Sequence, residues 1–276
     1  MITISAFADE IDADLDVQMY ICKKNGIKCI DVRGIDGRNV SSFTVAEAKE
    51  YRRRMEDGGF TVPCIGSPIG KIRMDEDFDA HLELLKNCCD VAGAFGTDRV
   101  RIFSFYASRG ADIADEREAV MDRMRAMVAV AESAGVTLYH ENESNIYGAL
   151  PDGVKDLFAT VRSPHLKGIF DPANFVVEGI RPYDEAWKAG LAELTDYFHI
   201  KDKRPQEKAC CPAGQGAGQI EQIFADLKER AWSGYMTLEP HMAVAGQFSG
   251  FTGPELFTKA VDGLKRLLDK LDMPYE

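Results

Sequence analysis

Eight short apolar segments recur along the chain, and each is followed by a polar stretch and then by a segment with helical periodicity. This alternation is typical of βα units arranged around a parallel sheet. The expected strands are residues 2–7, 28–33, 61–66, 99–105, 136–141, 166–171, 197–202 and 235–240, and the expected helices include residues 14–25, 46–57, 78–95, 116–134 and 219–231. Glycines just before several strands, as in AGVTLYH and SGYMTLE, indicate that the preceding helix ends in a left-handed residue.

These units extend over all 276 residues, and no linker rich in Pro, Gly or Ser divides the chain. We therefore predict one domain, residues 1–276, with an α/β fold of the closed (β/α)8 TIM-barrel type. A doubly wound open sheet is the alternative. That fold would place a glycine-rich phosphate loop after the first strand, and the segment AFADEID contains no glycine.

The formal net charge of −12 makes nucleic acid and anionic membranes poor partners, because the long-range field repels both. The first residues, MITISAFADEID, lack a basic region followed by an apolar core, and no apolar run is long enough to span a membrane. The seven cysteines form no C-x-x-C pair of the kind found in zinc ribbons. We expect a cytoplasmic protein with reduced thiols and a small-molecule substrate, and homo-oligomers are compatible with this.

Side chains of the types that bind metals stand at the ends of four consecutive expected strands, which end in or carry Glu141, Asp171, His199 and Glu239. In (β/α)8 barrels the chemistry lies at the C-terminal ends of the strands. This mixed oxygen and nitrogen set suits one Mn²⁺, Co²⁺, Mg²⁺ or Zn²⁺ ion, and three carboxylates alone would repel one another. Taken singly, Asp171 could cap a helix and His199 could be structural. Their joint occurrence favours a site for one divalent metal ion.

The same segments resemble the sugar isomerase and epimerase superfamily of xylose isomerase-like barrels, which includes ketose 3-epimerases, inosose isomerases and hydroxypyruvate isomerases. The matching pieces are YHENESNIYG, GIFDPANF, FHIKD, PAGQGAGQI and GYMTLEPH, and the likeness covers nearly the whole chain. The resemblance implies that one divalent cation is bound by Glu141, Asp171, His199 and Glu239. It also implies that Glu141 and Glu239 are the catalytic acid-base groups. Many family members carry a histidine where this chain has Asn174, which carries no proton at neutral pH.

The implied activity is that of a metal-dependent isomerase or epimerase of a keto-sugar, sugar phosphate or cyclitol. The reaction would proceed by proton abstraction next to a metal-polarised carbonyl and through a cis-enediolate. Two alternatives remain open: a metal-dependent lyase, either a dehydratase or an eliminase, on a related keto-sugar, and a non-catalytic carbohydrate-binding partner. Endonuclease IV shares the barrel, but this acidic chain lacks the basic surface that DNA requires.

Several residues on the expected βα loops are candidates for substrate contact. Lys201 shares a strand face with His199, because strand side chains alternate, and Asn174 follows the aspartate of the metal set. Further candidates are Arg204, Glu10, Arg33, Ser67 and Lys71. An ion pair with a nearby carboxylate is the alternative for Lys201, and ordinary solvated charge is the alternative for the loop residues. The glycine-rich residues 212–220 are expected to form a mobile flap or a turn into the next helix.

Overall fold

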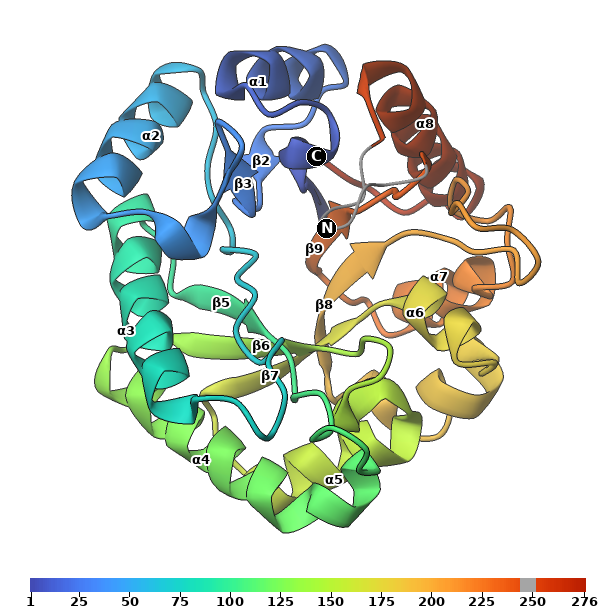
Figure 1. The fold of residues 1–276 in the computed structure, drawn as a ribbon. Coiled ribbons are helices and arrows are strands. Elements are labelled where there is room, and N and C mark those ends of the chain that lie inside the picture. The colour runs from blue at the N-terminus through green and yellow to red at the C-terminus, as the bar shows by residue number, and fades with distance from the viewer. Residues whose placement is uncertain (244–251) are drawn as a thin grey trace.

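The computed structural model describes residues 1–243 and 252–276. Seven parallel strands form one curled sheet in the order β2-β1-β9-β8-β7-β6-β5, with the helices on its outer side (Figure 1). The strands are β1 (Ile2–Ala6), β2 (Cys29–Ile30), β5 (Arg99–Ile102), β6 (Thr137–Glu141), β7 (Leu166–Phe170), β8 (Thr195–Ile200) and β9 (Gly234–Leu238). A separate antiparallel pair, β3 (Gly34–Ile35) and β4 (Arg38–Asn39), lies in the loop after β2.

Residues 61–66 close the ring between β2 and β5. This segment was expected to be the third strand, but it pairs only through isolated bridges, in which Ile65 is paired with Val32 on one side and with Val100 on the other. Pro63 precedes these bridges and has no N–H group, so it cannot donate to a regular ladder. Because the ring is closed, the prediction of a (β/α)8 barrel is confirmed and the open-sheet alternative is wrong.

The main helices are α1 (Leu15–Lys24), α2 (Val45–Asp57), α3 (Phe78–Phe95), α4 (Arg117–Ser133), α5 (Pro151–Val161), α6 (Pro172–Val177), α7 (Ile220–Glu229) and α8 (Pro254–Lys270). Side chains cap several of them as their sequence indicates: Asp14 begins α1, and Thr44 forms a capping box with Glu47 at α2. The five helices expected from periodicity are confirmed. Among the described residues, no helix is both long and apolar enough to cross a membrane.

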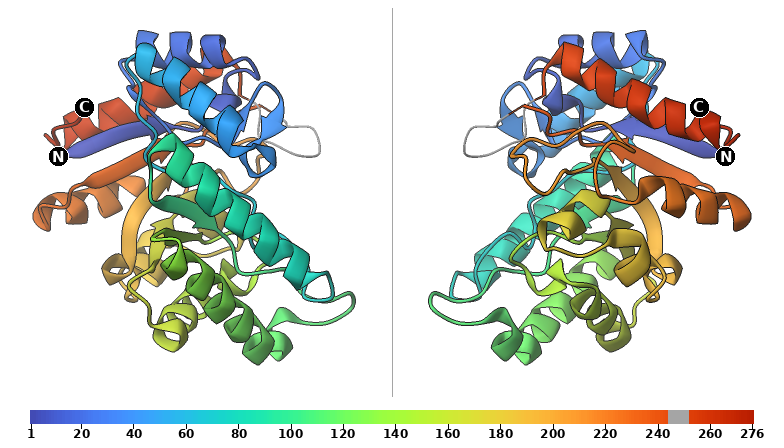
Figure 2. Two further views of the ribbon diagram at one scale, coloured as in Figure 1. Left: turned by 90° about the vertical axis from the view of Figure 1, so that its left-hand side faces the viewer. Right: turned by 90° about the vertical axis from the view of Figure 1, so that its right-hand side faces the viewer.

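The two chain ends lie next to each other (Figure 2). Near the C-terminus, Tyr275 forms an isolated bridge with Ile2 at the start of β1. Apolar side chains from the helices pack against the sheet around buried aromatic rings such as Trp187, whose centroid lies 5.4 Å from that of Phe170. The carboxyl ends of the parallel strands open at the opposite end of the barrel from the termini. The polar residues predicted at the strand ends therefore face a common mouth.

The glycine-rich residues 212–220 fold around the buried side chain of Asp202, which follows β8. Its carboxylate accepts backbone N–H groups from Gly214 at 2.9 Å, and from Gly216 and Gly218 at 2.8 Å each. A Cβ atom at Gly216 would lie 2.3 Å from Asp202 Oδ1, so the close approach requires glycine. The segment forms the turn into α7, and these three amides are already occupied by a carboxylate.

Replacing Asp202 by asparagine should lower the free energy of unfolding by about 3 kcal/mol, because an amide oxygen replaces two charged acceptor oxygens and leaves buried N–H groups without a partner. Urea denaturation followed by circular dichroism measures the change. The exposed Asp262 on α8 provides the matched control, since its change to asparagine should stay within about 0.5 kcal/mol of the parent. Equal stabilities of the two variants would contradict this role of Asp202.

Candidate metal centre

Four buried side chains converge at the mouth of the barrel. Glu141 is the last residue of β6, Asp171 directly follows β7, His199 lies near the end of β8, and Glu239 directly follows β9. One ligand atom from each lies within 4.8 Å of the others. β6 to β9 are consecutive neighbours in the sheet, so their carboxyl ends present these side chains side by side. The structure thus brings together the residues that the sequence singled out.

The imidazole of His199 faces the two glutamates through its Nδ1 atom. This atom lies 3.0 Å from Glu141 Oε1 and 3.6 Å from Glu239 Oε2. Within the described part of the chain it has no aligned hydrogen-bond partner, although it is buried. The edge-on packing of the His199 ring against Phe7, with centroids 4.9 Å apart, fixes the ring orientation. A buried nitrogen turned towards carboxylates without a hydrogen bond fits a metal ligand.

Three cationic side chains lie against the same carboxylates. Lys201 Nζ is 2.8 Å from Asp171 Oδ2 and 2.8 Å from Glu239 Oε2. Arg101 Nη1 is 3.2 Å from Glu141 Oε2, and Arg33 Nη1 is 2.8 Å from Glu239 Oε1. The ammonium of Lys201 and a metal ion would therefore share carboxylate oxygens, each of which has more than one acceptor site.

The charge balance of this cluster is negative. Its carboxylates are Asp9, Glu10, Glu141, Asp171 and Glu239, and its permanent cations are Arg33, Arg101 and Lys201. When all five acids are ionised, the three bases leave an excess of two negative charges, and protonation of His241 or of Asp171 lowers this excess by one each. Buried charges need a counter-charge, so the donor set and the charge balance both fit a divalent cation.

The carboxylates differ in their tendency to ionise. Burial raises the pKa of Asp171 to about 7, although Lys201 lies beside it. Burial also acts on Glu141, but His199 and Arg101 outweigh it and hold the pKa of Glu141 at about 2. For Glu239 the neighbouring Lys201 and His241 overcome burial and place its pKa well below the usual range. Both glutamates are thus charged at neutral pH, as ligands and proton acceptors must be.

Two of the residues suggested for substrate contact lie in the cluster itself. Lys201 contacts the carboxylates of Asp171 and Glu239, as described above. The side-chain amide of Asn174 donates to Glu141 Oε1 at 3.3 Å and to the carbonyl of Asn142 at 2.7 Å. Both residues line the mouth, a pocket of about 290 Å³ that also includes Glu143 and His241.

Three further candidates for substrate contact, Glu10, Ser67 and Lys71, lie on loops of the N-terminal third of the chain. Glu10 is buried, receives a hydrogen bond from Arg33 at 2.8 Å, and lies 3.1 Å from His241 Nε2. Lys71 pairs with Glu143 at 3.1 Å at the rim of the mouth. The Ser67 hydroxyl is buried and donates to the backbone carbonyl of Arg101, so it supports the chain beside the site.

Arg204 lies outside the cluster. Its Nη1 atom is 3.0 Å from Glu207 Oε1, and its Nε atom donates to the carbonyl of Gln215 at 2.9 Å. These contacts hold it against the glycine-rich turn rather than against the carboxylates of the cluster. A role of Arg204 in substrate binding remains a prediction.

Two residues of the cluster were missed by the sequence reasoning. Arg101 lies in β5, where its guanidinium is stacked 4.8 Å from the centroid of Phe7 and 4.9 Å from that of Phe103. Asp9 accepts from Arg33 Nε at 2.7 Å. The signal available for Arg101 was a charged residue between the apolar residues Val100 and Ile102 of a buried strand. Asp9 had no such signal, because it sits among other acidic loop residues.

The loop that carries Ser67 and Lys71 is held by His81 at the start of α3. The N–H of Gly70 donates to His81 Nε2 at 2.7 Å. Gly70 has φ +90°, and a Cβ atom there would lie 2.0 Å from the carbonyl oxygen of Phe103, so the loop depends on glycine at this point. Burial lowers the pKa of His81 from 6.5, which keeps the ring neutral and able to accept.

Acid should therefore remove the stabilisation that His81 provides. Its folded pKa is lowered, so the contribution is fully present above the unfolded value of 6.5 and is lost as the pH falls through the folded value. A His81→Gln variant keeps an acceptor without titrating. We expect that the free energy of unfolding of the wild type, relative to that of this variant, decreases as the pH is lowered from about 7.5 to about 5. Urea denaturation at each pH measures it. Parallel pH profiles of the two proteins would contradict this assignment.

Comparisons with known proteins agree with this architecture. A model of the xylose isomerase-like TIM barrel family matches residues 19–270. The probable 3-DHS dehydratase AsbF from Bacillus anthracis is similar in structure, with a TM-score of 0.73, 15% identity, and coverage of 95% of this chain and 98% of that chain. A D-tagatose 3-epimerase-like protein gives a TM-score of 0.73 at 14% identity, covering 98% of both chains.

A third solved structure is that of a xylose isomerase-like TIM barrel protein from Mycobacterium smegmatis in complex with magnesium. It is 17% identical, covers 98% of this chain and 97% of that chain, and has a TM-score of 0.71. At these identities the likeness to solved structures concerns the fold.

Proposed function

The chain belongs to the xylose isomerase-like TIM barrel family, and we propose that it is a divalent-metal-dependent isomerase or epimerase of a keto-sugar, sugar phosphate or cyclitol. The observation that carries this proposal is the convergence of Glu141, Asp171, His199 and Glu239 on one small volume at the mouth of the barrel. The two glutamates are ionised at neutral pH, buried, and next to a pocket large enough for one small ring. An ionised carboxylate within hydrogen-bond reach of a substrate in this pocket can accept a proton from the carbon next to a carbonyl.

A divalent ion held by these four residues would polarise the substrate carbonyl and acidify the neighbouring C–H group. One of the two glutamates removes that proton, and the C–H electron pair moves into an enediolate. Return of a proton to the adjacent carbon completes an isomerisation, whereas return to the opposite face of the same carbon completes an epimerisation. We assign both proton transfers to Glu141 and Glu239.

Neighbouring polar side chains would assist these proton transfers. Arg101 and Lys201 lie against the glutamates and provide fixed positive charge near the substrate oxygens, where negative charge develops. Asn174 donates to Glu141 and so orients the carboxylate. The amide of Asn174 does not carry a proton at neutral pH, and in this proposal proton transfer is left to the glutamates.

The test is solvent deuterium incorporation. The metal-supplemented protein is incubated in D₂O with a panel of ketohexoses, ketopentoses, their phosphates and an inosose, and the recovered sugars are analysed by NMR. We expect deuterium at the carbon next to the carbonyl together with a new isomer. Turnover without deuterium would contradict proton abstraction to solvent-exchangeable groups. Ultraviolet absorbance from a conjugated product would identify a lyase instead, and no change in any sugar would favour a non-catalytic carbohydrate-binding protein.

A further inference from the structure

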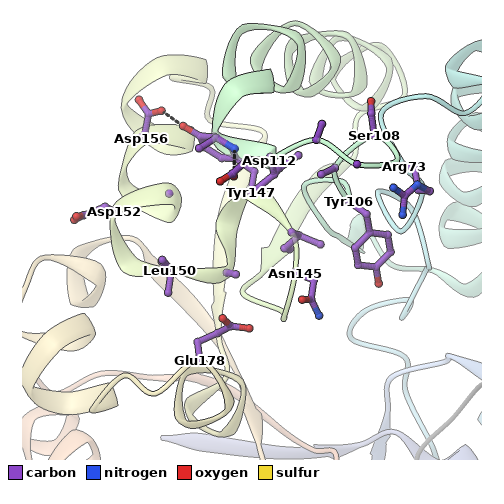
Figure 3. Close-up of a pocket in the computed structure, with 18 residues that line it drawn as sticks. Arg73, Tyr106, Ser108, Asp112, Asn145, Tyr147, Leu150, Asp152, Asp156 and Glu178 are labelled. Carbon is purple, nitrogen blue, oxygen red and sulfur yellow. Dashed lines mark hydrogen bonds between the residues drawn. The ribbon is translucent and has the colours of Figure 1, made fainter.

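A second, larger groove lies beside the mouth, at the same end of the barrel. Its volume is about 1,140 Å³, against about 290 Å³ for the mouth. Figure 3 shows Tyr106 on the loop after β5, Asn145 and Leu150 on the loop after β6, and Glu178 at the end of α6 around this groove. Small-molecule sites typically occupy about 300–1,000 Å³, so the mouth alone suits one small ring and the groove adds room for more.

The groove and the mouth are adjacent along two stretches of chain. Glu143 and Ser144 line the mouth, and the next two residues, Asn145 and Ile146, line the groove. At the end of α6, Val177 lines the mouth and the following residue lines the groove. A molecule that reacts over the metal centre can therefore extend into the groove without crossing a wall of the barrel.

The groove offers both apolar and hydrogen-bonding surface. Of the large apolar side chains that the structure describes, only five are exposed, and two of these lie here: Leu150 is 47% exposed in the groove, and Val177 is 55% exposed at the border. The base of the groove is well packed, because Ile146 contacts the buried Phe103 and also Tyr106. Such exposed apolar side chains, gathered beside a polar site, mark a binding surface.

Polar groups stand at the edges of this apolar surface. Within residues 1–243 and 252–276, the side chains of Asn145 and Glu178 make no hydrogen bond or ion pair, and both line the groove. By contrast, the carboxylate of Asp156, which also lines the groove, is already engaged with Tyr147 and Arg117. An apolar face bordered by free amide and carboxylate groups matches a ring that has C–H faces and hydroxyl groups at its edge.

We propose that the groove is a subsite for a second ring, linked by a glycosidic oxygen to the sugar unit that reacts at the metal centre. The substrate class is thus a glycoside, in which the second ring is either another sugar or an aryl group. Both share an apolar face that packs on Leu150 and Tyr106, and hydroxyl groups that bind Asn145 and Glu178. This inference deepens the proposed function and rests on it for the position of the reacting unit.

Binding of glycosides that lack a keto group tests the subsite separately from catalysis, because the proposed reaction requires that group. The probes are methyl β-cellobioside and methyl α-maltoside for a second sugar ring, the two anomers of phenyl D-glucopyranoside for an aryl ring, and the two methyl D-glucopyranosides as one-ring references. Saturation-transfer NMR gives the dissociation constants with the magnesium-loaded protein, because Mg²⁺ is diamagnetic and does not broaden the ligand signals. We expect at least one two-ring probe to bind about tenfold tighter than the methyl glucoside of the same anomer, as burial of one apolar face supplies about 1.4 kcal/mol. The tighter probe identifies the second ring.

The Leu150→Ser, Glu178→Gln double variant should remove this preference and leave the affinity for the methyl glucosides unchanged. Val45→Ser is the matched control, because Val45 is an exposed apolar residue at the start of α2 and lies outside the groove. The proposal is overturned if the double variant keeps the preference for a two-ring probe. It is also overturned if the wild type binds no two-ring probe more tightly than the methyl glucoside of the same anomer, or binds none detectably. Dissociation of an oligomer by the double variant, seen in analytical ultracentrifugation, would instead assign the groove to a second copy of the chain.

The two proposals fail in different ways. If the wild type exchanges no substrate proton but still binds a two-ring probe more tightly, the subsite is supported and the proposed chemistry is rejected. Proton exchange with one-ring and two-ring substrates at the same efficiency would keep the chemistry and reject the subsite.

Discussion

Replacing Glu141 by glutamine should lower the rate of substrate proton exchange by about 10³-fold. The amide keeps the size of the side chain but cannot accept a proton, and general acid-base groups typically contribute 10²–10⁴-fold to a rate. The measurement is deuterium wash-in at saturating Mn²⁺, so that weaker ion binding does not enter the rate. Glu193→Gln is the control, because Glu193 lies far from the mouth in an exposed ion pair with Arg230.

The control variant should exchange protons at the wild-type rate. A Glu141→Gln protein that stays within about tenfold of the wild type would remove Glu141 from the acid-base role, since a positioned base contributes more than that. Glu239 would then be the only glutamate of the pair that handles the proton.

The second large effect is expected for stability. Arg33→Ala should lower the free energy of unfolding by about 3–5 kcal/mol, because removal of one partner leaves buried charges without compensation. The guanidinium of Arg33 contacts Asp9 at 2.7 Å and both Glu10 and Glu239 at 2.8 Å, and only a tenth of its side chain is exposed. Urea denaturation in the presence of EDTA measures the change without a contribution from bound ions.

Two further variants control the Arg33 experiment. Arg53→Ala removes an exposed arginine that pairs with Glu50 and Asp57 on α2, and surface pairs of this kind contribute at most about 1 kcal/mol. Arg33→Lys keeps the charge but cannot reach three carboxylates with a planar fork, so it should lie between the wild type and Arg33→Ala. A loss for Arg33→Ala as small as for Arg53→Ala would show that the three carboxylates find other compensation.

The sequence predicted the barrel and the grouping of Glu141, Asp171, His199 and Glu239, because both depend on local regularities. Strand ends follow from apolar runs, and their order along the chain places the last residues of β6 to β9 side by side. Glu141 and Asp171 could therefore be selected as candidates without knowledge of how the elements pack. Residues 61–66 deviated from a regular strand because Pro63 removes a ladder donor, and the effect of one proline on pairing depends on both neighbouring strands.

Contacts between distant segments could not be predicted in the same way. Arg33 is 206 residues from Glu239, and nothing in the sequence of its loop shows that the guanidinium lies against that carboxylate. Alternation along a strand indicates only that Asp202 and Lys201 lie on opposite faces, and the role of Asp202 in holding three amides of the glycine-rich turn required the fold. The groove next to the mouth is formed by four loops, so neither its volume nor its lining follows from periodicity.

The metal content of the untagged, purified protein, measured by elemental mass spectrometry, tests the central claim most directly. His199→Ala and the control His165→Ala are measured beside the wild type; His165 hydrogen-bonds to the carbonyl of Val136, at the start of the β6 segment and away from the mouth. We predict about one divalent ion per chain in the wild type and in His165→Ala, and its loss in His199→Ala. Wild-type protein that stays free of metal when offered Mn²⁺, Co²⁺, Mg²⁺ and Zn²⁺ would contradict the metal centre and the chemistry proposed for it.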